Sequence, residues 1–177
     1  MDANTRGFTL IELLTVVALI GVIGAMALPA FTQMIENNRR VAAVNDLLST
    51  IHVARSEAIT RNQRISICPA NTGQTACEAG GWQKGWLIFR DVGADGVFEA
   101  VDGDEIIRVG DGLRGNLSVV SAEFQSAVTF GPNGRVAGGD GTILLCADGV
   151  ATAVRRIDID RTGRPRSVVA EPADGCA

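Results

Sequence analysis

The chain has 177 residues, a net charge of −4 at neutral pH and 46% hydrophobic residues. This is enough for one domain with a core, and it excludes a globally disordered chain. The acidic balance excludes a protein that binds nucleic acid as a bulk polycation, although a local basic patch stays possible. His52 is the single histidine. Because a His-based zinc site or a Ser-His-Asp triad would need it, we expect no enzyme, metal site or cofactor.

The N-terminal part of the sequence is strongly apolar. No charged residue lies between Leu13 and Ile35, and this length fits one helical crossing of a hydrocarbon layer about 30 Å thick. A cleaved secretory signal peptide and a buried core helix are the alternatives. A long apolar run that continues without a break into a helical pattern favours a membrane-spanning segment over residues 8–31 that stays on the mature protein.

Residues 32–63 have the pattern of an amphipathic helix. Apolar side chains recur at spacings of three, four or seven, which is one stripe of a helix: Met34, Val41, Val44, Leu48, Ile51 and Ala58. We therefore expect one long helix from Phe8 to Arg61, with its second half packed on a globular head.

Residues 64–177 have the pattern of a β-rich head. Short alternating or apolar segments separated by glycine-rich turns predict strands at 64–68, 86–89, 126–130, 142–146 and 155–160. No long helical pattern recurs, which argues against βαβ units. The predicted fold class is α+β, a long N-terminal helix laid on an antiparallel sheet.

The four cysteines, Cys68, Cys77, Cys146 and Cys176, all follow the apolar segment. Four cysteines allow three pairings, and we prefer Cys68–Cys77 with Cys146–Cys176. A Cys₄ zinc site is the alternative, but the sequence has no C-x₂-C knuckle. Disulfides would place the head in an oxidising compartment such as the periplasm or the cell exterior.

The start of the chain carries a specific motif. Glu12 lies where the apolar segment begins, and an ionised side chain there is costly unless it is paired. The run from Arg6 to Glu12, RGFTLIE, resembles the prepilin leader of type IV pilins and type II secretion pseudopilins. The resemblance implies that a prepilin peptidase cuts between Gly7 and Phe8, removes the leader 1–7 and N-methylates Phe8. It also implies that Glu12 faces the free amine of a neighbouring subunit in the filament.

The head adds a second resemblance. The segments ARSEAITRNQRISIC, CADG and IDIDRTGRPR, with Trp82 and Trp86 around QKG, are together similar to the GspH/FimT group of minor pilins and pseudopilins. This implies a type IV pilin-like fold and other major and minor pilins or pseudopilins as partners. It also implies a single-pass protein in inner-membrane lipid, with its head in the periplasm before it reaches the pilus or the cell surface.

Some FimT-type minor pilins bind DNA during natural transformation through a Gly-Arg-x-Arg motif, which stands here as Gly163-Arg164-Pro165-Arg166. Residues 155–166 carry five arginines against two aspartates, a net charge of +3. Guanidinium groups suit phosphate, so extracellular duplex DNA is a candidate partner. Arg164 and Arg166 are the main candidates and Arg161 is next, whereas three other cations are peripheral: Arg155, Arg156 and Lys84. The alternative for the motif is a solvated or ion-paired hairpin. The alternatives for the whole protein are a type II secretion pseudopilin and a minor pilin that does not bind DNA and primes pilus assembly.

The head also contains two weaker patterns, a group of aspartates and a pair of tryptophans. Asp91, Asp95, Asp102 and Asp104 lie among glycines, but their spacing fails that of an EF-hand, so we expect a polar loop. Trp82 and Trp86 could stack on bases, but packing in the core or at a sheet edge is the preferred interpretation.

Overall fold

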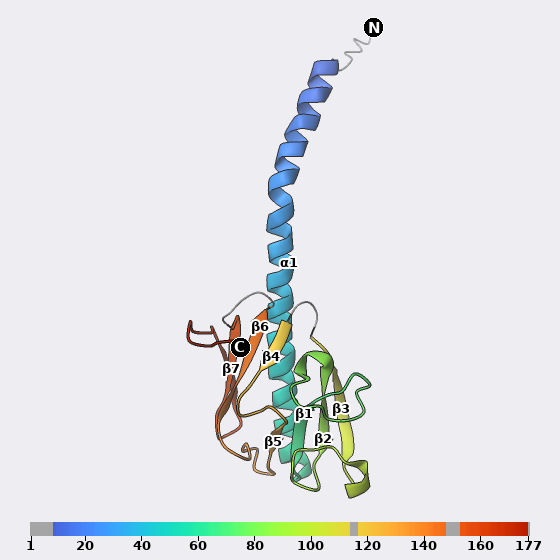
Figure 1. Ribbon diagram of the computed structural model, residues 1–177, viewed down its shortest axis with the longest axis vertical. Helices are drawn as coiled ribbons and strands as arrows, with labels where there is room; N and C mark the ends of the chain where they lie inside the picture. The colour runs from blue at the N-terminus through green and yellow to red at the C-terminus, as the bar shows by residue number, and fades with distance from the viewer. Residues whose placement is uncertain (1–8, 114–116, 148–152, 177) are drawn as a thin grey trace, which may run out of the picture. The chain divides into compact units, whose positions relative to one another are not determined.

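The structure is a computed structural model that describes residues 9–113, 117–147 and 153–176, without the side chains of residues 26 and 28–30. Helix α1 runs from Leu10 to Arg61 without interruption (Figure 1). This agrees with the single long helix expected from the sequence. The chain divides into two compact units, Met1–Asn38 and Arg39–Ala177, which are described separately below.

The first unit consists of the beginning of α1. Its large apolar side chains are exposed all around the helix from Leu10 to Ile23, so nothing within this unit covers them. In the part of the chain that the structure describes, no helix is both long and apolar enough to cross a membrane. The expected spanning segment 8–31 includes Phe8 and four side chains outside the described residues, and the span stays a prediction.

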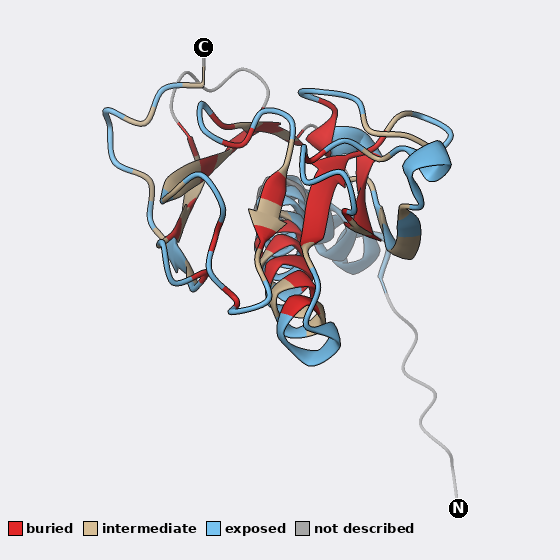
Figure 2. Cartoon of the chain, turned by 90° about the horizontal axis from the view of Figure 1, so that it is seen from below, coloured by how far each residue is buried: buried red, intermediate tan, exposed pale blue. Residues whose placement is uncertain are grey.

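In the second unit, one face of α1 packs against the sheets of the head (Figure 2). The buried residues of this face are Ala43, Val44, Leu47, Ile51, Ala54 and Ala58. The predicted stripe was therefore right at Val44, Ile51 and Ala58, but wrong at Met34 and Val41, which are exposed. Three of these positions are alanines, two of which, Ala43 and Ala54, the predicted stripe of mostly large apolar residues did not include.

The head contains two four-stranded antiparallel sheets beside α1 (Figure 1). The first has the order β3-β2-β1-β5, with β1 Ile65–Pro69, β2 Gly85–Arg90, β3 Glu105–Asp111 and β5 Val128–Phe130. The second has the order β4-β6-β7-β8, with β4 Leu117–Val120, β6 Gly141–Ala147, β7 Arg155–Ile159 and β8 Pro165–Val168. Two short 3-10 turns, Trp82–Lys84 and Ala100–Asp102, lie between strands.

All five strands expected from the sequence are present, and the α+β class is confirmed. The single sheet we expected is instead two sheets, and three strands were missed: β3, β4 and β8. All three are edge strands, as is β5, which the sequence did predict. β3 and β8 are half solvated and interrupted by a charge or a proline, as at Arg108 and Pro165, so they lack the apolar alternation by which the other strands were recognised. β4 has only four residues, too few for its alternation to be recognised.

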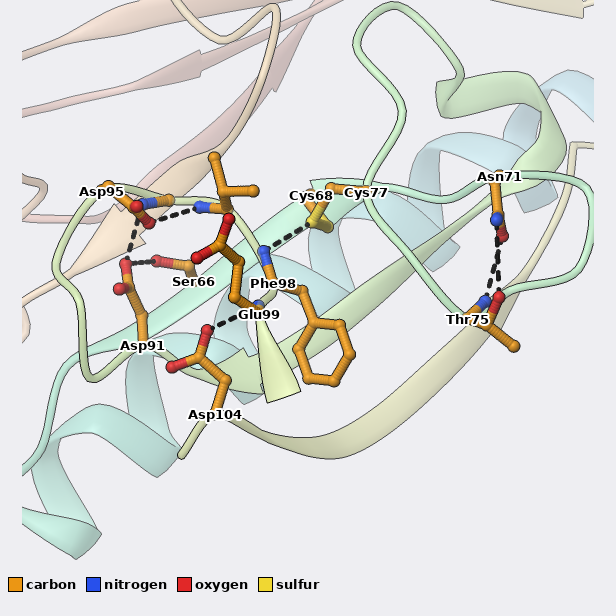
Figure 3. Close-up of a disulfide and its surroundings, with 12 residues drawn as sticks. Ser66, Cys68, Asn71, Thr75, Cys77, Asp91, Asp95, Phe98, Glu99 and Asp104 are labelled. Atoms are coloured by element: carbon orange, nitrogen blue, oxygen red, sulfur yellow. Dashed lines mark hydrogen bonds between the residues drawn. A yellow bond between two sulfur atoms is a disulfide. The ribbon is translucent and has the colours of Figure 1, made fainter. Parts of the chain in front are cut away.

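The structure contains both preferred disulfides, Cys68–Cys77 and Cys146–Cys176. The first joins β1 to the loop that follows it, and the sulfur of Cys77 accepts a hydrogen bond from the Phe98 backbone amide at 3.3 Å (Figure 3). The second joins β6 to the C-terminal tail across 30 residues of sequence. The tail is also held by a hydrogen bond from the amide of Ala153 to the carbonyl of Asp174, at 2.8 Å.

We expect the C-terminal disulfide to stabilise the head more than the shorter one, because a longer closed loop restricts the unfolded chain more. Replacing Cys146 and Cys176 by alanine should lower the free energy of unfolding by about 3 kcal/mol. The matched control, C68A/C77A, closes a loop of nine residues and should cost about 1 kcal/mol less. Denaturant titration of the isolated head measures both, and equal losses would contradict the loop-length argument.

Candidate functional site

Side chains of Thr9 and Glu12 cap the N-terminal end of α1. The backbone amide of Glu12 donates to the hydroxyl of Thr9 at 3.3 Å, and the amide of Thr9 approaches the Glu12 carboxylate at 3.5 Å. This reciprocal pattern is a capping box, which satisfies backbone donors at the start of a helix. A Thr followed three residues later by Glu is the sequence signal of a capping box, but the sequence analysis did not predict this contact from it. Gly7 and Phe8, the predicted cleavage pair, lie outside the described residues.

The candidate DNA-binding motif lies at the turn between β7 and β8, which the carboxylate of Asp160 organises. One of its oxygens accepts hydrogen bonds from the amide of Thr162 at 2.8 Å and from the amide of Arg164 at 3.1 Å. The Thr162 hydroxyl donates to the same oxygen. These bonds, with that of the Thr162 hydroxyl foremost, hold the pKa of Asp160 below its usual value, and the nearby charge of Arg166 adds to the effect.

Gly163 fixes the turn to the rest of the head. It is buried, with a φ of 76°, and a Cβ at this position would lie 2.2 Å from the carbonyl oxygen of Gly134. The same oxygen accepts a hydrogen bond from Nε of Arg55, a residue of α1, at 3.1 Å. The glycine of the motif is therefore a positioning residue, because only a residue without a side chain lets the two turns meet above the helix.

Arg164 and Arg166 are exposed and share one face. Both line a concavity of about 380 Å³, as expected for residues two apart on an extended segment. Four carboxylates line the same concavity: Glu123, Asp140, Asp158 and Asp160. The strand register places Asp158 directly opposite Arg166. Among the described residues, no carboxylate lies within ion-pair distance of either arginine. Their guanidinium groups can therefore receive an external anion.

Three of the four other basic candidates are engaged, whereas Arg155 has no ion pair among the described residues. Nε of Arg161 pairs with Asp140 at 2.9 Å. The half-buried Arg156 pairs with Asp158 at 3.0 Å and with Asp174 of the C-terminal tail at 3.4 Å. Lys84 pairs with Glu78 in the 3-10 region before β2. The net charge of +3 counted along the sequence is thus largely neutralised in space, which the charge count alone did not anticipate.

Two weaker patterns prove to be structural. Asp91 is buried, and its carboxylate accepts a hydrogen bond from the hydroxyl of Ser66 at 2.7 Å (Figure 3). It also accepts one from the amide of Ala94 at 2.6 Å. Within the described residues, no group of three or more His, Cys, Asp or Glu is placed to hold a metal ion. Trp82 and Trp86 are buried in the core, so their indole rings are not available to stack on bases.

Comparison with known proteins agrees with this architecture. The family model described as "Type II transport protein GspH" matches residues 43–163, and that of the prokaryotic N-terminal methylation motif matches residues 2–28. Fimbrial protein Q of Moraxella bovis is 45% identical over 42 residues, 24% of this chain and 27% of that protein. The match thus spans about a quarter of the length of that relative.

Solved structures show the same fold. The type IV minor pilin FimU of Pseudomonas aeruginosa strain PAO1 has a TM-score of 0.60 at 24% identity, over 80% of this chain and 98% of that one. E. coli GspH has a TM-score of 0.54 at 11% identity, over 77% of this chain and 92% of that one.

A methylation motif ahead of a helix that packs on an antiparallel head defines a type IV pilin-like filament subunit. This chain belongs to the GspH family, whose model covers 43–163, and it is a minor pilin or pseudopilin.

We expect Gly163→Ala to destabilise the head by about 2 kcal/mol or more, because the new Cβ adds a backbone clash to a strained positive φ. The matched control is Gly138→Ala, which has a φ of 91° but nothing within 4 Å of a Cβ. It should cost about 1 kcal/mol, from backbone strain alone. Thermal unfolding of the two variants measures the difference, and an equal loss would mean that the contact with Gly134 is not tight.

Proposed function

We propose that the chain is a minor type IV pilin, made as a precursor and displayed on a pilus. The methylation motif over 2–28 supports removal of the leader 1–7 by the prepilin peptidase and methylation of Phe8. The apolar side chains exposed from Leu10 to Ile23 support burial of this segment, first in inner-membrane lipid with the head in the periplasm and then among other pilin helices. The two disulfides support an oxidising location for the head.

Glu12 is proposed to set the position of the subunit in the filament. Its carboxylate lies at the start of an apolar helix, and among the described residues it accepts a long hydrogen bond from the Thr9 amide, at 3.5 Å. A charge-assisted bond is shorter and stronger than this contact. The methylated amine of Phe8 on a neighbouring subunit supplies such a donor and offsets the cost of burying the carboxylate.

The head is proposed to bind extracellular duplex DNA for uptake in natural transformation. The observation that carries this proposal is the pair Arg164 and Arg166, exposed on one face of a turn held by Gly163 and Asp160. Two guanidinium groups without an internal ion pair can each bind a backbone phosphate. Such binding is independent of sequence, weak for one subunit and sensitive to salt.

A pseudopilin of a type II secretion filament is the second candidate. The description of the matching family as a type II transport protein favours it, as do the four carboxylates around the two arginines, which would repel a polyanion. In that case, the concavity would face another subunit or a secreted protein rather than DNA.

Duplex binding by the head separates the two candidates. The head, residues 36–177, contains the whole described core and should bind a fluorescent duplex with log affinity falling linearly in log salt. The double variant R164E/R166E should bind roughly tenfold or more weakly, with a salt slope smaller by about 1.8. The matched control R39E/R108E has the same charge change at exposed residues outside the motif and should bind more tightly than R164E/R166E. Equal behaviour of the two double variants would favour the pseudopilin.

The N-terminal proposal has its own test. Mass spectrometry of the membrane-extracted protein should find a chain that begins with N-methylated Phe8, and a chain that begins at Met1 would refute processing. Glu12→Ala should abolish incorporation into filaments. Thr9→Ala, which removes the capping partner but keeps the carboxylate, should still assemble. If Glu12→Ala assembles normally, the proposed pairing with a neighbour's amine is wrong.

A further inference from the structure

The ion pair between Arg161 and Asp140 lies at the edge of the arginine-bearing concavity. Asp140 immediately precedes β6 and Arg161 follows β7, and the pairing of Gly141 with Ile159 brings these two strand ends together. The Arg161 Nε donates to the Asp140 carboxylate at 2.9 Å, and the two side chains are 73% and 65% exposed. Neither side chain supports the core, so the pair is free to exchange partners with solvent components.

This contact also stabilises the ionised form of the Asp140 carboxylate. The hydrogen bond from Arg161 is the largest cause that holds the pKa of Asp140 below its usual value, and the charge of Arg161 adds to it. Asp140 occupies the Nε donor of Arg161, which a phosphate would need for a two-point contact along that edge of the guanidinium. Asp140 also lines the concavity with Arg164 and Arg166.

We infer that Asp140 limits the DNA affinity of the head by occupying Arg161 as an internal substitute for a backbone phosphate. The inference rests on the proposed DNA-binding function and adds an affinity-determining residue to it. In the wild-type head, Arg164 and Arg166 make the phosphate contacts, while Arg161 stays with Asp140. A chain that must accept DNA and later release it gains from such a restraint, because weak contacts are exchanged readily when several subunits share one duplex.

The expected change in DNA affinity is small, because both side chains of the Arg161–Asp140 pair are exposed. Exposed ion pairs contribute little, so their loss changes an equilibrium by about 1.4- to 5-fold. Removing the Asp140 charge also removes one repulsive group near the phosphates. An arginine that newly contacts one phosphate steepens the dependence of log affinity on log salt by about 0.9 for duplex DNA. The change in slope separates a new contact from a general change in charge.

The experiment measures binding of a fluorescent duplex to the head across a salt series. Asp140→Asn should raise the affinity about two- to fivefold and steepen the salt slope by about 0.9. Asp111→Asn is the matched control, because it removes the same charge from an exposed residue at the end of β3 in the other sheet. It should leave the slope unchanged. In an Arg161→Gln background, Asp140→Asn should no longer steepen the slope.

The outcomes distinguish this inference from the proposed function. If the wild-type head binds DNA through Arg164 and Arg166 but Asp140→Asn leaves the slope unchanged, the role of Asp140 is refuted and the function stands. If the wild-type head does not bind but Asp140→Asn does, the role of Asp140 stands and the function of the natural chain is refuted. Absence of binding by both proteins overturns both. Unchanged thermal unfolding of the variants confirms that the fold is intact.

Discussion

The packing of one face of α1 against the two sheets places every feature of the head. Ala54 and Ala58 are fully buried on this face. The neighbouring Arg55 reaches from the helix to the carbonyl oxygen of Gly134, and that carbonyl sits against Gly163. The candidate motif is thus fixed to the helix through two turns rather than displayed on an unsupported hairpin.

The sequence predicted the parts of the fold that have a strong local signal. The long helix, the five inner or apolar strands and both disulfides could be inferred, because helical spacing, apolar runs and cysteine order are properties of short segments. Three of the four edge strands and the division into two sheets could not, because they depend on pairing between distant segments. Leu47 and Ala54 were missed in the helix for a related reason, since burial is decided by the partner surface as well as by the helix.

In the candidate site, too, the features with a local sequence signal were predicted and those that depend on distant residues were not. The motif containing Arg164 and Arg166 was found from sequence, and the structure shows the two side chains lining one concavity. The roles of Asp160 and Asp140 were not found, because a carboxylate that organises a turn and one that pairs with Arg161 look alike in a sequence. The linear count of charges treated Arg156 and Arg161 as available, whereas both have partners that lie elsewhere along the chain.

The contacts of Arg156 link the end of the chain to the surface that carries the motif. Its guanidinium bridges Asp158, which lines the concavity, and Asp174, which lies two residues before the cysteine that joins the tail to β6. The disulfide and the ion pair therefore hold the same short stretch of tail beside the residues that line the concavity. Since thiols are kept reduced in the cytosol, a head in a reducing compartment would hold Asp174 by fewer restraints, so the charge pattern around the concavity depends on the redox state of a bond outside it.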